Sequence, residues 1–144
     1  MVVAVSAYRR GAPVRRARAL HHEIYAGFEA GTLSPAEYAH ASNALLKRLF
    51  IHGLGVHGAR RASDADWLEM LDRYAEAPGF AEGPGMALGN LRFRSHQTID
   101  VPALHALISR LLQQRNLPAR AKRETAPHGA GAGEAGQTET VGQQ

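Results

Sequence analysis

The stretch that decides the fold is residues 63–75, SDADWLEMLDRYA. Ser63 is a residue type that often caps a helix, and Asp64 and Asp66 would place negative charge at the positive end of the helix dipole. Apolar residues then recur at spacings of three and four, which predicts a helix with one buried face. The predicted face consists of Trp67, Leu68, Leu71, Tyr74 and Ala75. Because this stretch carries the only tryptophan of the chain, we expect its helix to be central to the core.

A second helix is predicted from the tetrapeptide SPAE at residues 34–37. Ser34 would cap the helix, Pro35 would take the first helical position, and Glu37 would bond back to the cap amide. The helix should run to about His52 and end at the glycine that follows. Its expected buried face consists of Tyr38, Ala41, Leu45, Leu46, Leu49 and Phe50.

Two further helices complete the predicted core. The first should run over residues 13–30, because proline suits a first helical position and Gly31 suits a stop. The last should begin at Asp100 and end near Asn116. Their expected apolar faces consist of Ala17, Leu20, Ile24 and Phe28 in the first helix, and of Leu104, Leu107, Ile108, Leu111 and Leu112 in the last.

The segments between these helices are predicted to be irregular. Residues 53–62 are interpreted as a solvated loop. They are too long for the turn of a DNA-reading helix-turn-helix, although a short helical turn within them would allow a variant as the alternative. Residues 80–100 hold several glycines, so we expect an ordered glycine-rich loop with a short extended segment at 91–94. This loop should be pinned by Phe80, Leu88, Leu91 and Phe93.

These patterns predict an all-α fold, a small four-helix domain spanning residues 13–117. Residues 118–144 hold many Gly, Ala, Gln, Thr and Glu and only one large apolar residue, Val141. Such a segment cannot bury enough apolar surface to offset its ordering entropy, so we expect a disordered tail.

The charge of the chain is concentrated near its N-terminus. The formal net charge is +4, but residues 34–114 hold eight basic and eight acidic residues. The excess comes from arginines at 9, 10, 15, 16 and 18, which have no acid between them, and from basic residues after the last predicted helix. The chain has no cysteine, which excludes disulfides, thiolate catalysis and cysteine-ligated metals.

Residues 1–12 combine an apolar start, MVVAVSAY, with the first arginines. A membrane span needs roughly 20 apolar residues, so this stretch is too short to cross a bilayer. Tyrosine followed by arginines is typical of the cytoplasmic end of a transmembrane helix. The alternative is a disordered start, which residues 1–12 alone favour.

No catalytic, cofactor or metal site is predicted. The chain has eight histidines, but none is placed at the spacing of a metal-binding motif, so they are interpreted as scattered surface or half-buried residues. Asp64 and Asp66 are better explained as helix-capping residues than as a catalytic pair. Asp72 has no such explanation, and Arg60 and Arg61 are candidate partners for it. We therefore expect the protein not to be an enzyme.

Several short motifs occur in a fixed order: NALLKR at 43–48, DWLEMLD at 66–72, FAEGPG at 80–85 and LRFR at 91–94, followed by the leucine-rich last helix. This order resembles the soluble domain of an uncharacterised family of bacterial single-pass membrane proteins, over about residues 15–115. Genes of that family usually lie beside a MoxR-type AAA+ ATPase and von Willebrand factor A domain proteins. The chain departs from the family in retaining at most the end of the transmembrane helix, and in having Asp64 where relatives tend to have glycine.

The resemblance implies a non-enzymatic interaction or accessory module at the cytoplasmic face of the inner membrane, if an anchor lies upstream, and otherwise in the cytoplasm. The implied partners are the MoxR-type ATPase and the von Willebrand factor A proteins, and an anionic membrane surface could bind the N-terminal arginines. The alternative is a nucleic-acid-binding helical domain, although we do not expect a nucleic-acid partner. The candidate interaction residues are Arg9, Arg10, Arg15, Arg16, Arg18, Arg60, Arg61 and Asp72.

Overall fold

The computed structural model describes residues 2–89, 98–115 and 117–125, with side chains from Gly11 to Ala121. Every regular element in these ranges is helical, which confirms the all-α class. The longer helices are α1 (Val2–Glu29), α2 (Pro35–Arg48), α4 (Asp64–Ala75), α5 (Val101–Leu112) and α6 (Leu117–Thr125). The short elements are a π-helix, η1 (Leu49–Gly53), a single helical turn, α3 (Gly58–Arg61), and a 3-10 helix, η2 (Pro84–Leu88).

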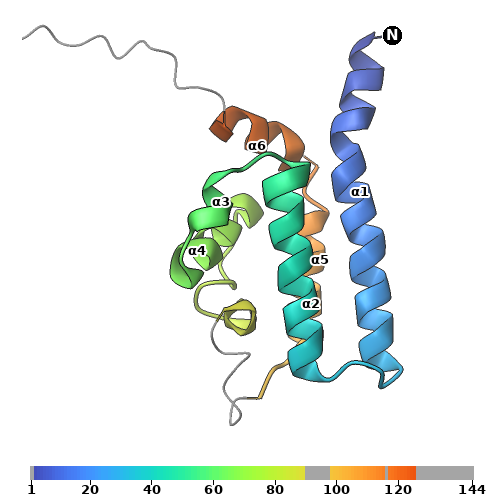
Figure 1. The fold of residues 1–144 in the computed structure, drawn as a ribbon, viewed down its shortest axis with the longest axis vertical. Helices are drawn as coiled ribbons and strands as arrows, with labels where there is room; N and C mark the ends of the chain where they lie inside the picture. The colour runs from blue at the N-terminus through green and yellow to red at the C-terminus, as the bar shows by residue number, and fades with distance from the viewer. Residues whose placement is uncertain (1, 90–97, 116, 126–144) are drawn as a thin grey trace, which may run out of the picture.

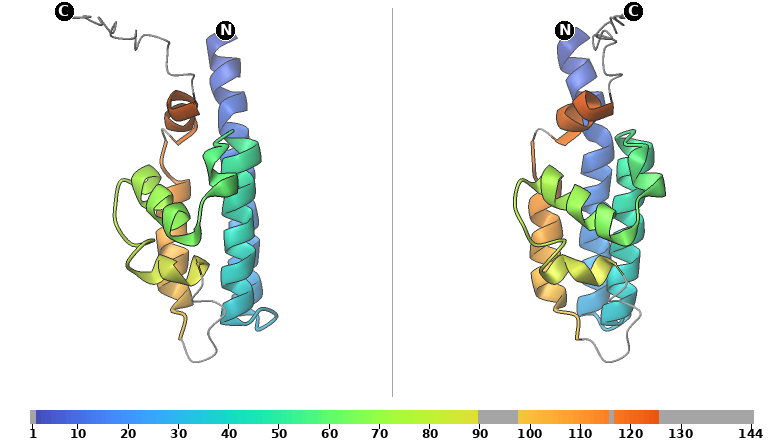
Figure 2. Two further views of the ribbon diagram at one scale, coloured as in Figure 1. Left: turned by 60° about the vertical axis from the view of Figure 1, so that its left-hand side comes forward. Right: turned by 90° about the vertical axis from the view of Figure 1, so that its left-hand side faces the viewer.

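Three helices form the body of the domain. Figures 1 and 2 show α1, α2 and α5 side by side along the long axis, with α3, α4 and η2 packed against one side of them. Helix α6 crosses near the end where α1 begins. The four expected helices correspond to α1, α2, α4 and α5, whereas α3 and α6 are additional.

Helix α1 differs from the prediction in its start and in its buried face. It begins at Val2, so Pro13 lies inside it, although a proline there removes one backbone hydrogen bond and its ring crowds the carbonyl four residues earlier. The residues that face the core are Val14, Ala17 and His21, while Leu20 is 42% exposed. The buried face is therefore rotated relative to the predicted stripe, and it packs against both α2 and α5.

The predicted start of α2 is confirmed. The Ser34 hydroxyl accepts a hydrogen bond from the Glu37 amide (3.1 Å), and the Ser34 amide donates to the Glu37 carboxylate (2.9 Å). The helix continues to its expected end, but its last turn is the π-helix η1. There the Leu54 amide donates to the Leu49 carbonyl at 2.7 Å, a bond that spans five residues.

The connection after η1 is not the loop that the sequence predicts. Its alternative, a short helical turn, is present as α3. Val56 and Ala59 are buried, so the connection adds apolar side chains to the core instead of remaining solvated.

Helix α4 and the segment after it agree largely with the prediction. The Ser63 hydroxyl accepts from the Asp66 amide (3.2 Å), and the whole predicted apolar face of α4 is buried. Phe80 and Leu88 are fully buried as expected, but η2 replaces part of the irregular loop. The extended segment at 91–94, with Leu91 and Phe93, lies outside the described residues.

The structure places the C-terminal end of the ordered helices later than the sequence predicted. The prediction placed a disordered tail from residue 118, whereas α6 continues to Thr125, with Leu117 and Ala121 fully buried. The guanidinium of Arg120 donates to the Tyr74 and Arg73 carbonyls in the last turn of α4, and thus ties α6 to the end of that helix. The remainder of the predicted tail, residues 126–144, lies outside the described residues.

Within the described ranges, each helix is either too short or too polar to traverse a lipid bilayer.

Candidate functional site

The motif residues around Trp67 form a closed structural cluster. The Trp67 indole N–H donates to the Asn43 side-chain oxygen at 2.8 Å, and the Lys47 ammonium lies 5.7 Å from the ring centroid. Phe50 meets the same ring edge to face, at 5.6 Å between centroids, and also meets Tyr74. Trp67 is fully buried and its polar atom is satisfied, so this cluster fixes α2 against α4 and presents no reactive group.

Asp72, one of the candidate interaction residues, has a structural role within the fold. Its two carboxylate oxygens accept hydrogen bonds from the backbone amides of Phe80 (2.8 Å) and Ala81 (3.1 Å). Gly85 lies so close to Phe80 that a Cβ atom there would overlap the Phe80 backbone. Asp72 thus holds the turn after α4 in place, and the carboxylate faces its own backbone, not Arg60 or Arg61.

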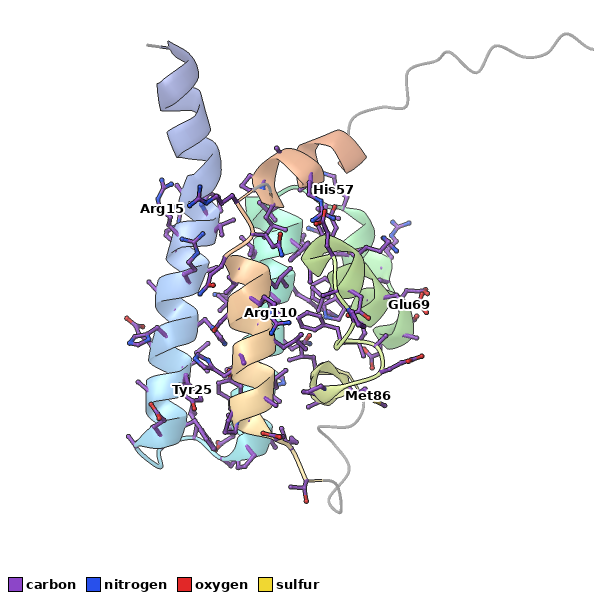
Figure 3. All side chains as sticks on the ribbon, turned by 180° about the vertical axis from the view of Figure 1, so that it is seen from behind. Arg15, Tyr25, His57, Glu69, Met86 and Arg110 are labelled. Carbon is purple, nitrogen blue, oxygen red and sulfur yellow. The ribbon has the colours of Figure 1, made fainter. Side chains whose placement is uncertain are left out.

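The remaining acidic residues of α4 do not share a cleft. Asp66 and Glu69 are exposed, and Figure 3 shows Glu69 pointing away from the bundle. Asp64 and Asp66 occupy the first turn of the helix, where the partial positive charge of the N-terminus stabilises them. This placement agrees with the predicted capping role.

A buried histidine cluster is a further polar feature of the core that the sequence analysis did not predict. His21 of α1 lies 2.9 Å from the Tyr38 hydroxyl of α2, and that hydroxyl lies 3.4 Å from Nδ1 of His105 on α5. Tyr25 stacks on His105 with 3.7 Å between ring centroids and an interplanar angle of 8°. In Figure 3 the Tyr25 side chain is directed from α1 toward α5. The cluster therefore cross-links three helices.

The environment of this cluster keeps its rings neutral. Burial, together with the nearby rings of His105 and His22, lowers the pKa of His21 to about 4. Burial also lowers the pKa of His105, against the opposing charge of Glu29, and raises the pKa of the Tyr38 hydroxyl. At neutral pH the hydroxyl can donate to one imidazole and accept from the other. The helical spacing of Val14, Ala17 and His21 could have predicted that His21 is buried, but only if histidine is counted among core residues.

The geometry of a metal site is absent from the part of the chain that the structure describes. No group of three histidine or acidic side chains there is placed to hold an ion. His52 and His57 are exposed, as predicted, whereas His21 is only 3% exposed and corrects the prediction of scattered surface or half-buried histidines.

The predicted basic residues do not gather into one surface. Arg9, Arg10, Arg15, Arg16 and Arg18 lie along α1, whereas Arg60 and Arg61 are exposed on α3. Figure 1 shows α3 on the opposite side of α2 from α1. Arg18 is partly engaged, because its Nε donates to the Leu112 carbonyl at 2.8 Å. The α1 and α3 arginines are therefore separate features.

A groove with a volume of about 260 Å³ lies between α1, α2 and η1. Its floor is apolar and includes Ala17, Leu20, Leu45 and Leu49. Arg16 and Arg48 line its edge together with His52, and no acidic residue lines it. We call this feature the α1–η1 groove. It brings Arg16, one of the predicted α1 arginines, together with Arg48, which was not among the candidate interaction residues.

Comparison with known proteins identifies the family but no characterised relative. No curated protein and no solved structure matches the chain significantly. One family model matches residues 1–114, and its description is "Domain of unknown function (DUF4381)". The match covers α1 to α5, including every motif on which the resemblance was based. The chain therefore belongs to the DUF4381 family of domains of unknown function.

Proposed function

We propose that this domain is a non-enzymatic interaction module at the cytoplasmic face of a membrane, working with a MoxR-type AAA+ ATPase and von Willebrand factor A domain proteins. The observation that carries the proposal is the course of α1. Its N-terminal end extends beyond α2 and α6 (Figures 1 and 2). Along this projecting helix the sequence changes from apolar residues to arginines.

The projecting end is suited to a membrane interface. A basic residue near an anionic bilayer contributes about 1 kcal/mol of attraction. Arg9 and Arg10 follow the apolar residues directly in the same helix, so an apolar end at the bilayer would bring both arginines to the headgroups. The rest of the domain would then extend away from the membrane and remain accessible to other proteins.

The partners come from the resemblance, and the internal structure is compatible with a binding role. The motif residues around Trp67 and Asp72 are used to build the fold. The described carboxylates and histidines either cap helices, brace the core or face solvent. An interaction module needs a rigid body with accessible surfaces, which is what this arrangement supplies.

Vesicle binding tests the membrane part of the proposal. The full chain should co-sediment with vesicles of phosphatidylcholine and phosphatidylserine and bind less to phosphatidylcholine alone. Arg9→Glu with Arg10→Glu should abolish the preference, while Arg60→Glu with Arg61→Glu, which changes the net charge equally, should preserve it. Equal losses for both pairs would show that overall charge, not the α1 end, determines binding.

Co-purification tests the partner part. The tagged chain, expressed in cells that hold the ATPase and the von Willebrand factor A proteins, should recover at least one of them after crosslinking. Recovery of neither would remove the proposed role. The nucleic-acid alternative is disfavoured because α4, the helix after Arg60 and Arg61, begins with two aspartates that phosphates would repel. It predicts a steep loss of affinity with salt, which a titration with duplex DNA measures.

A further inference from the structure

We propose that the α1–η1 groove binds an acidic helical segment of a partner protein and receives one or two of its apolar side chains. This inference rests on the interaction role proposed above and adds to it a surface and a ligand chemistry. It follows from the size of the groove, its charge, its construction and its position along α1.

The size of the groove suits side chains and not a whole small-molecule ligand. Its volume of about 260 Å³ lies below the range of about 300–1,000 Å³ that is usual for small-molecule sites. Leu20 in the floor is 42% exposed, although it lies on a helix that packs against two others. An apolar side chain from a partner would cover it. Helical partners commonly bind in this way, with residues one turn apart inserted into a groove.

The charge of the groove selects an acidic partner. Arg16 and Arg48 are exposed, and neither makes a hydrogen bond or an ion pair with any residue that the structure describes. No carboxylate among the lining residues would repel an acidic segment or compete for the arginines. Carboxylates placed on either side of an apolar anchor would therefore meet a guanidinium while the anchor enters the floor.

The construction of the groove gives it a defined shape. One wall is formed by η1, which contributes Leu49, His52 and Gly53. A Cβ atom at Gly53 would lie 2.9 Å from the Cβ of Pro13, so glycine allows α1 and η1 to touch at this end. A π-helical turn is rare and often occurs at functional sites. Here it places residues of the α2 end along α1 that a regular helical turn would direct elsewhere.

The position of the groove favours a protein over a lipid. With a rise of 1.5 Å per residue, Arg16 lies roughly 16 Å along the helix axis from Val5. The polar region of one leaflet is only about 5–7 Å thick. If the apolar end of α1 touches the hydrocarbon, Arg9 and Arg10 lie at the headgroups and Arg16 lies beyond them. The two sets of arginines would then bind different partners.

A labelled synthetic peptide provides the direct test. The probe is a helical peptide with leucines one turn apart and glutamates on both sides of them, and its controls replace glutamate by glutamine or leucine by serine. Fluorescence anisotropy with the full-length protein should detect binding of the probe. Each control peptide should bind more weakly, because charge and apolar contact are both required.

Protein variants locate the binding surface. Arg16→Glu with Arg48→Glu should lower the affinity for the probe peptide by about tenfold, since two attractions become repulsions. Leu20→Ser should weaken it by a few-fold. The matched control is Arg110→Glu with Arg115→Glu, which has the same net charge and should change affinity by less than about twofold. Arg110 lies on α5, on the side of the domain seen in Figure 3, and it is not among the residues that line the groove.

Three results would overturn the inference. The first is a probe that fails to bind, and the second is equal weakening by the groove pair and the control pair. The third concerns anionic vesicles. If Arg16→Glu with Arg48→Glu reduced vesicle binding as much as Arg9→Glu with Arg10→Glu does, the groove would bind lipid.

Recovery of the proposed partners distinguishes a failure of this inference from a failure of the proposed function. If the groove variants still recover the ATPase or the von Willebrand factor A proteins, the groove is not their docking surface, while the proposed function stands. If the probe binds at the groove and neither protein is recovered by the parent chain, the ligand chemistry stands and the proposed partners are wrong.

Discussion

The Trp67 cluster and the α1–η1 groove differ in burial and in how far their polar groups have partners. In the cluster every described polar atom of Trp67 and Asp72 has a partner, and the rings are fully buried. In the groove an apolar floor remains partly exposed, and Arg16 and Arg48 make no polar contact with described residues. The cluster is built from residues of the NALLKR and DWLEMLD motifs, whereas only Leu45 and Arg48 of NALLKR line the groove. Most of these motif residues therefore build the fold, and the groove draws on a single motif.

Trp67→Ala should produce the largest loss of stability. Truncating a fully buried tryptophan leaves a cavity and removes the partner of Asn43, at a cost of roughly 3–5 kcal/mol. Met86→Ala is the control, because Met86 is 41% exposed on η2. Urea denaturation followed by circular dichroism measures both variants. Equal midpoints for the two would mean that α4 is not central to the core.

Gly85→Ala should be the next most costly change. A Cβ atom at this position overlaps the Phe80 backbone, so the turn held by Asp72 must move, at a cost of about 3 kcal/mol. Gly58→Ala is the matched control, since a Cβ there meets nothing within 4 Å and the residue is helical. The same denaturation experiment should show the control at or slightly above the stability of the parent. A stable Gly85→Ala protein would show that the turn is plastic.

Local signals account for what the sequence predicted of these regions. The caps at Ser34 and Ser63, the apolar face of α4 and the pinning by Phe80 depend on neighbouring residues, and all are present. The burial of His21 fits a helical spacing that counts as a core pattern only if histidine is treated as a core residue. The π turn of η1 depends on contacts between distant segments, so no local pattern indicated it. Helix α6 is another such case, because its sequence is polar and becomes ordered by burying Leu117 and Ala121 and by bonding Arg120 to the end of α4. The groove could not be predicted, since Leu20 appeared to belong to the buried face.

Replacing the buried His21 should change stability by less than changes in the Trp67 cluster and by more than changes in the groove. His21 titrates near pH 4 in the folded chain and near about 6.5 when unfolded, so the unfolded state binds more protons between these values. Its contribution to stability is complete above the unfolded pKa and falls as the pH drops, by about 2 kcal/mol at about pH 5. His21→Gln should flatten this part of the pH profile, which chemical denaturation at a series of pH values measures.

His57→Gln is the control for that experiment. His57 is exposed and is not among the groups that lower the pKa of His21, so its replacement should leave the acid-dependent loss in place. His105 faces His21 directly, and its own lowered pKa contributes to the slope that remains in the His21 variant. An unchanged slope in His21→Gln would show that the ring is protonated in the folded protein.

Changes in the groove should have the smallest effect on stability. Leu20→Ser and Arg16→Glu alter exposed side chains without described polar partners, so each should shift the free energy of unfolding by no more than about 0.5 kcal/mol. Thermal melts of both variants beside Trp67→Ala give the measurement. If either groove variant lost several times that amount, Leu20 or Arg16 would be supporting the helix packing of the free domain. The floor of the groove would then contribute to folding stability, and the groove would not differ in this respect from the Trp67 cluster.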